Sequence, residues 1–217
     1  MNYLDQFQQL SEQRKRIDDL VTNLNLDYIN KIKGRFVNEK DPYMQAEVSF
    51  SFRMRALGFH LGAMLTYLES IPQRLQDLHY ESRKAGLSPM SLYIGEEFAI
   101  DVLHLFKSVL FNLVSFIDYT GTLVCCCFEQ QNIQKWDGLK SACDSKENLL
   151  SRLKLSSSVK LFEKELVNRI YKLRSVVIHN RNIWVNINTK WDLMNSKYEV
   201  TILAPQAEVK KFSELSI

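Results

Sequence analysis

The segment from Leu105 to Phe128 most constrains the fold of this chain, because it is long and almost entirely apolar. Three polar residues, Lys107, Asn112 and Asp118, interrupt it. A charge at membrane depth is costly, so this pattern favours the central buried helix of a bundle over a membrane span. No second segment supports a membrane-spanning protein, and we expect no membrane association.

Glycine and proline are scarce, with 7 Gly and 4 Pro among 217 residues. So few glycines and prolines disfavour flexible linkers and a β fold rich in turns. Hydrophobic residues make up 46% of the chain and charged residues 24%, as in ordinary globular proteins. The length suits one generous domain, so we predict a single all-α domain over residues 1–217.

Apolar spacing predicts the order of the helices. A narrow stripe (Leu10, Ile17, Leu20, Leu24 and Tyr28) indicates a long N-terminal helix over residues 1–33. A second helical region is expected over 46–84, split at Pro72, and a third over 94–130. Trp136–Gly138 predicts a turn, and shorter helices are expected over 146–153 and 206–212.

The clearest helical periodicity follows the serines at 156–158, which make a good helix start. Apolar residues recur there at spacings of three and four: Val159, Phe162, Leu166, Ile170, Leu173 and Val177. This pattern predicts one amphipathic helix. From Ile183 onward the pattern alternates instead, which predicts a small C-terminal β-hairpin over residues 183–203.

Cysteines Cys125, Cys126, Cys127 and Cys143 do not match the spacing of a zinc site. They suit the interior of a helix bundle as small apolar groups, and a reduced, cytoplasmic setting is the default for such thiols. The N-terminus lacks the pattern of a signal peptide. No carboxylate cluster has metal-ligand spacing, so we expect neither a metal nor a cofactor.

Arg174 and His179 are the strongest candidates for chemistry, at the point where the helical pattern gives way to the strand pattern. An arginine can hold a phosphate by two parallel hydrogen bonds, and a histidine can exchange a proton near neutral pH. Five helical residues turn the direction of a side chain by about 140°. The two side chains therefore converge only if the helix ends near His179 or if a second copy of the chain supplies the missing half.

The stretch from Tyr171 to Asn182 resembles the motif of the HEPN superfamily, an arginine followed after four to six residues by a histidine late in an α-helical domain. The resemblance implies a HEPN-like helical bundle that forms a homodimer with facing motif helices. Many members are metal-independent endoribonucleases in toxin–antitoxin, phage-exclusion and RNA-processing systems, and others are inactive binding modules. It also implies that Arg174 binds phosphate and that His179 is the acid/base group. Ser175 stands where the family commonly has Asn, Asp or His.

Further residues are candidates for contact with RNA: Ser175, Asn180 and Arg181 beside the motif, and Asn112 and Ser115 on the central helix. We expect the last two near the motif helix if the two helices pack antiparallel. Each candidate has a structural alternative. His179 can interact with the helix dipole, Asn180 can cap the helix, and the central polar residues can be satisfied core groups.

The resulting prediction is a homodimeric, metal-independent endoribonuclease that leaves 2′,3′-cyclic phosphate ends. The resemblance implies a toxin or phage-defence role, with RNA as substrate and an antitoxin protein as a partner. The net charge of +3 permits an anionic partner without indicating one. The alternative is a catalytically inactive helical module that dimerises, binds other proteins or binds a nucleotide.

Overall fold

The computed structural model describes residues 3–31, 41–86, 91–128, 130, 132–145, 155–179, 186–192 and 197–203. This part of the chain is an α-helical bundle, with two short strands near the C-terminal end of the sequence. It divides into two compact units, which are described separately below. The first comprises Met1–Phe59 and Val109–Arg174, and the second comprises His60–Ser108 and Ser175–Ile217.

The helices and strands follow in this order. Helix α1 spans Tyr3–Lys31, α2 spans Pro42–Lys84, α3 spans Ser91–Cys127 and α4 spans Lys135–Asp144. Helix α6 (Leu155–Phe162), the π-helical turn η1 (Glu163–Val167) and helix α7 (Asn168–His179) then follow without a break. Strand β1 (Asn186–Asp192) pairs antiparallel with β2 (Lys197–Leu203), within the range predicted for a hairpin.

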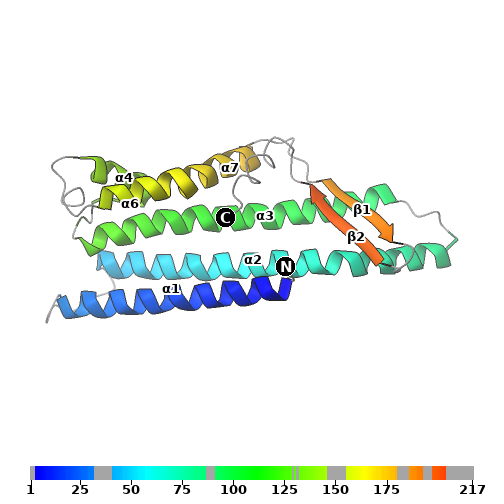
Figure 1. The fold of residues 1–217 in the computed structure, drawn as a ribbon, viewed down its shortest axis with the longest axis horizontal. Helices are drawn as coiled ribbons and strands as arrows, with labels where there is room; N and C mark the ends of the chain where they lie inside the picture. The colour runs from blue at the N-terminus through cyan, green and yellow to red at the C-terminus, as the bar shows by residue number, and fades with distance from the viewer. Residues whose placement is uncertain are drawn as a thin grey trace. The chain divides into compact units, whose positions relative to one another are not determined.

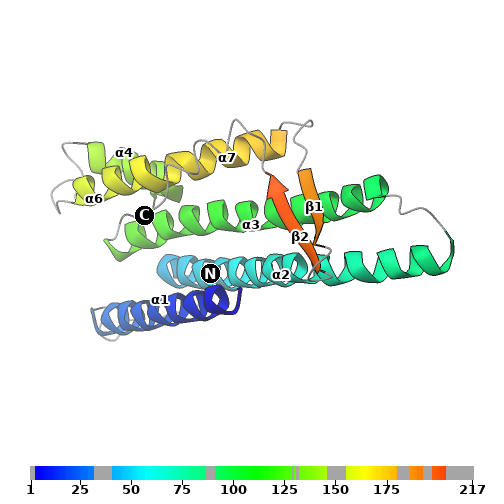
Figure 2. The same ribbon diagram turned by 45° about the vertical axis from the view of Figure 1, so that its right-hand side comes forward.

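Within the first unit, α3 lies between two layers of helices (Figures 1 and 2). Helices α1 and α2 lie on one side of it, and α4, α6 and α7 lie on the other, with α7 antiparallel to α3. Buried residues of α3 therefore enter two clusters. One joins Leu123 and Cys126 to α1 and α2, and the other joins Val114, Ile117 and Cys125 to the C-terminal helices.

The second unit is held by packing between the later part of α2 and the earlier part of α3. Ile71 and Leu75 bury their side chains against Phe98 and Val102. This packing explains why the predicted break at Pro72 is wrong: α2 continues through it to Lys84. Burial against tertiary neighbours offsets the hydrogen bond that a proline removes from a helix.

A π-helical turn corrects the predicted buried face of the amphipathic helix. Phe162 and Leu166 were predicted to face the core, yet both are exposed, and Glu163 and Val167 are buried in their place. Residues that share a face are spaced more widely in a π-helical turn than in an α-helical one, and here Glu163 and Val167 share the buried face with Val159. The regular pattern resumes with Ile170, which is buried as predicted.

Two other sequence predictions are wrong in detail. Among the described side chains of α1, Val21 is buried and Ile17 and Leu24 are half-buried, whereas Leu10 and Leu20 are exposed. The side chain of Tyr28 lies outside the described part of the chain. Trp136–Gly138 lies inside α4, and the turn comes immediately before it. The helices predicted over 146–153 and 206–212 lie outside the described residues.

The apolar segment forms one long helix, as predicted. The span Phe98–Cys127 is long and apolar enough to cross a membrane by length and composition, a criterion that core helices of soluble proteins also meet. Cys125, Cys126 and Cys143 are free and buried, in agreement with their predicted role as small apolar groups. Burial raises the pKa of the Cys125 thiol to about 12.

Candidate functional site

The motif helix α7 carries Arg174, Ser175 and the backbone of His179, where it ends. The helix is unbroken between the arginine and the histidine, and five residues of an α-helix correspond to about 140° around its axis. Ser175 is exposed. The side chain of His179, and all of Asn180 and Arg181, lie outside the described part of the chain.

Arg174 lies next to a hydrogen bond that ties α7 to the central helix. The Tyr171 hydroxyl donates to Asp118 Oδ1 over 2.6 Å. Burial and this carboxylate raise the pKa of Tyr171, and the positive charge of Arg174 opposes the increase. The Nε atom of Arg174 is buried and has no hydrogen-bond partner among the described residues. A buried donor without an acceptor is costly, and an incoming anion would satisfy it.

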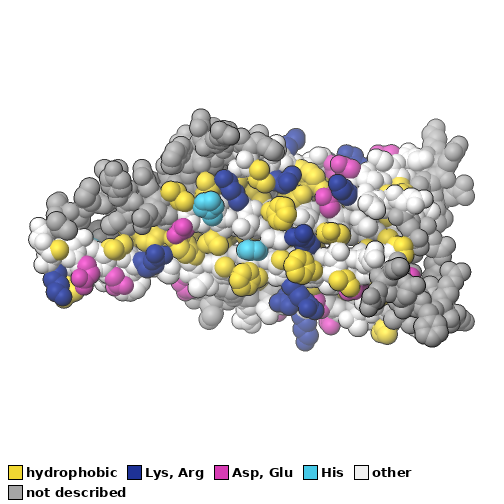
Figure 3. Space-filling view, turned by 180° about the vertical axis from the view of Figure 1, so that it is seen from behind, with side chains coloured by type: hydrophobic (Ala, Val, Ile, Leu, Met, Phe, Trp, Pro, Cys, Tyr) yellow, Lys and Arg dark blue, Asp and Glu magenta, His cyan; other side chains and the backbone are white. Residues whose placement is uncertain are grey.

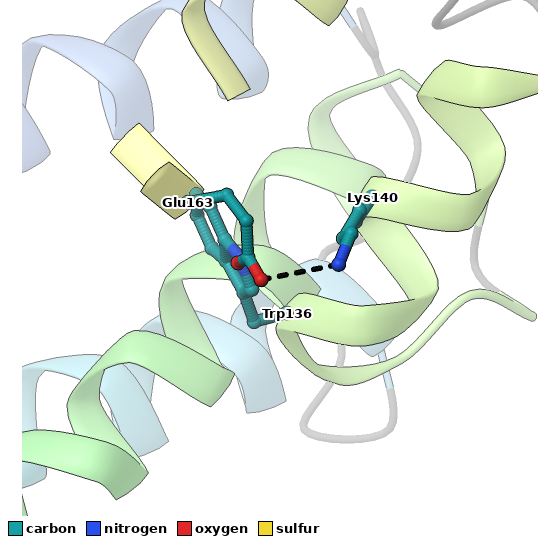
Figure 4. A network of polar contacts seen from close by, with 3 residues as sticks. All are labelled: Trp136, Lys140 and Glu163. Atoms are coloured by element: carbon teal, nitrogen blue, oxygen red, sulfur yellow. Dashed lines mark hydrogen bonds and ion pairs between the residues drawn. The ribbon is translucent and has the colours of Figure 1, made fainter. Parts of the chain in front are cut away.

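The turn η1 is anchored by a buried carboxylate (Figure 4). The Trp136 indole N–H donates to Glu163 Oε2 over 2.5 Å, and Lys140 Nζ donates to Glu163 Oε1 over 3.1 Å. The Trp136 ring also packs on Phe162, with their centroids 5.3 Å apart. Through these contacts α4 holds Glu163 in the interior, at the turn where the buried face of the helix departs from the predicted one.

Asn112 and Ser115 lie near Arg53 of α2. Arg53 Nη1 donates to Asn112 Oδ1 over 3.5 Å, and Asn112 is buried. Ser115 and Arg53 both line one cavity. The face of α3 that packs with the C-terminal helices instead carries Val114 and Ile117. The structure therefore brings these two candidates to Arg53, an arginine that the sequence analysis did not single out.

The cavity that Ser115 lines has a volume of about 420 Å³ and lies within the first unit. Its lining comprises Pro42, Gln45, Ala46, Ser49, Arg53, Ser115, Asp118, Tyr119, Thr122, Cys126, Gln134 and Lys135. Its polar residues on α2, Gln45, Ser49 and Arg53, recur every four positions, and this spacing was the signal available in the sequence.

No group of three or more His, Cys, Asp or Glu residues with the geometry of a metal site occurs among the side chains that the structure describes. Comparison of the chain with protein families, curated proteins and solved structures finds no match.

Proposed function

We propose that this chain is a homodimeric, metal-independent endoribonuclease of the HEPN type, acting as a toxin or phage-defence effector. The observation that supports it best is the buried Nε of Arg174, which has no acceptor within the described residues. Arg174 stands on the helix that carries the histidine of the motif. A phosphodiester would supply the missing acceptor and would neutralise the guanidinium charge.

The proposed reaction uses two groups. Neutral His179 removes the proton of the ribose 2′-hydroxyl, and the oxygen attacks the adjacent phosphorus. The bond to the 5′-oxygen then breaks, which leaves a 2′,3′-cyclic phosphate and a free 5′-hydroxyl. Arg174 offsets the negative charge that develops on the phosphate oxygens. Because the two residues diverge on one helix, each reaction centre draws Arg174 from one subunit and His179 from the other.

Cleavage of RNA in the presence of EDTA tests the proposal. We expect His179→Ala and Arg174→Ala each to lower the cleavage rate at least about a hundredfold, since each removes a group that acts on the transition state. The matched controls are His104→Ala and Arg169→Ala, both exposed, which should cleave at the unaltered rate. Cleavage products should carry cyclic phosphate ends, detected by mass spectrometry.

Mixing the two inactive variants tests the shared reaction centre. In a mixed dimer one centre would lose both groups and the other would keep both, so part of the activity should return. No recovery despite subunit exchange would exclude a centre built from two subunits. A His179→Ala variant that cleaves as fast as the unaltered protein would overturn the proposal itself.

A non-catalytic assembly module is the second candidate, and exposed leucines on α1 favour it. Leu20 is 59% exposed and Leu26 is 54% exposed, although both are large and apolar. If they form an interface, replacing both with serine should lower the oligomeric mass measured by light scattering without unfolding the protein. Leu78→Ser, an exposed leucine on α2, is the control. An unchanged mass would count against this role for α1.

A further inference from the structure

The cavity in the first unit lies between α2 and α3 and reaches the start of α4. Ser49 and Arg53 line it from α2, and Ser115 and Thr122 line it from α3. At about 420 Å³ its volume is in the range of small-molecule sites. Apolar residues such as Phe50 and Leu123 pack next to these faces in a buried cluster. The walls of the cavity therefore mix polar and apolar side chains and rest on a buried apolar cluster.

Arg53 supplies a positive charge that is held in place. Its guanidinium carbon lies 5.5 Å from the ring centroids of both Phe52 and Phe111. Both rings are exposed, and Figure 3 shows hydrophobic side chains of this kind at the surface beside Lys and Arg. Within the described residues Arg53 forms no ion pair, and it donates one long hydrogen bond, to Asn112 over 3.5 Å. Most of its N–H donors can therefore serve an anion.

Lys135 supplies a second cation at the edge of the cavity. Its φ angle of 62° is in the left-handed region, where a side chain is disfavoured and glycine or asparagine is usual. Its backbone N–H donates to Thr122 Oγ1 over 2.9 Å, which helps to hold this conformation. Strained backbone that is kept in place often marks a functional position.

Asp118 is the carboxylate in the lining, and its hydrogen bonds lie within the protein. Its Oδ1 atom accepts from the Tyr171 hydroxyl over 2.6 Å and from the Trp136 backbone N–H over 3.3 Å. This carboxylate holds α4 and α7 against α3. Both donors are neutral and leave the negative charge of the carboxylate in place, so the lining carries the charges of Arg53, Lys135 and Asp118.

We infer that this cavity binds a small organic phosphate, with the phosphate held by Arg53 and the polar body set against Ser49 and Ser115, toward Lys135. This site is separate from the motif on α7 and does not depend on ribonuclease activity. An arginine for the phosphate, with hydroxyl groups and a lysine along the cavity for the sugar body, are donors that such a phosphomonoester can use.

Isothermal titration calorimetry of the full chain with ribose 5-phosphate, inorganic phosphate and ribose tests the inference. We expect ribose 5-phosphate to bind more tightly than inorganic phosphate, and ribose alone not to bind. Arg53→Gln should weaken the binding of ribose 5-phosphate at least tenfold. Arg55→Gln, an exposed arginine of the same helix that does not line the cavity, should leave it unchanged.

Lys135→Gly separates a ligand-binding role from a structural one. Glycine tolerates the positive φ angle, so the variant should melt at a higher temperature while it binds ribose 5-phosphate several-fold more weakly. A higher melting temperature with unchanged affinity would remove Lys135 from the site. No saturable binding at millimolar ribose 5-phosphate, or an equal loss in Arg53→Gln and Arg55→Gln, would overturn the inference. Arg174→Ala should bind as the unaltered protein does, so that failure here and failure of the ribonuclease proposal are distinguishable.

Discussion

Trp136→Ala is expected to lower the free energy of unfolding by about 4 kcal/mol or more, the range for removing a large aromatic side chain from a packed core. Trp136 is 4% exposed and belongs to the cluster that joins α3, α4 and the C-terminal helices. Its loss removes the ring contact with Phe162 and the hydrogen bond to Glu163. Because Glu163 is only 8% exposed, its carboxylate would lose a donor that solvent cannot readily replace. Urea unfolding followed by circular dichroism at the helical band measures the change.

Two further variants separate the parts of this effect. Trp136→Phe keeps an aromatic ring but removes the indole N–H, so we expect a loss of about 1–3 kcal/mol from Glu163 Oε2, which loses its donor while Oε1 keeps Lys140. Phe59→Ala also truncates an aromatic residue, but its ring is 72% exposed, and the change should be within about 0.5 kcal/mol. Equal losses for Trp136→Ala and Phe59→Ala would show that α4 is not part of the core.

The sequence was sufficient to predict the helical class and the central helix, because both depend on properties averaged over many residues. The apolar run of α3 and the low glycine and proline content each exclude most alternatives. The antiparallel strands within 183–203 follow from an alternating pattern of the same kind. A hydropathy pattern that extends over many residues therefore predicts an element even where single residues depart from it.

Single residues with strong local preferences gave the wrong predictions, because tertiary contacts override such preferences. Pro72 continues a helix because Ile71 and Leu75 are packed on both sides of it. The shift of the buried face in η1 depends on Trp136, which reaches Glu163 from 27 residues away in sequence. No periodicity within the helix itself encodes that contact.

Among the candidate residues, one could be identified from the sequence, and two depend on tertiary contacts. Arg174 was identified from a short motif, and its Nε, which has no acceptor among the described residues, adds a structural reason to propose it as an anion-binding group. Arg53 could not be identified in this way, because its neighbours Asn112 and Ser115 are about 60 residues distant and come together only when α2 packs on α3. Lys135 has no sequence signal, since its φ angle is set by the packing of the turn before α4.

Gly121→Ala should test that packing directly, with an expected loss of about 3 kcal/mol in the free energy of unfolding. A Cβ atom at this position would lie 2.6 Å from the Lys135 carbonyl oxygen and 2.8 Å from Trp136 Cα. These are backbone atoms, so no side-chain rotation can relieve the clash. The first residues of α4 would have to move. This movement would strain the hydrogen bonds from the backbone N–H groups of Lys135 and Trp136 to Thr122 and Asp118.

Gly58→Ala is the matched control, because it makes the same substitution inside a helix with the opposite expected sign. A Cβ atom at Gly58 would meet nothing within 4 Å. Alanine there should raise the free energy of unfolding by about 0.5–1 kcal/mol, through the lower conformational entropy of the unfolded chain and the higher helix propensity. The two variants should therefore differ by roughly 4 kcal/mol in urea unfolding, the sum of the loss and the gain. If Gly121→Ala were as stable as Gly58→Ala, the first residues of α4 would not contact α3 at Gly121, and the position assigned to Lys135 beside the cavity would be wrong.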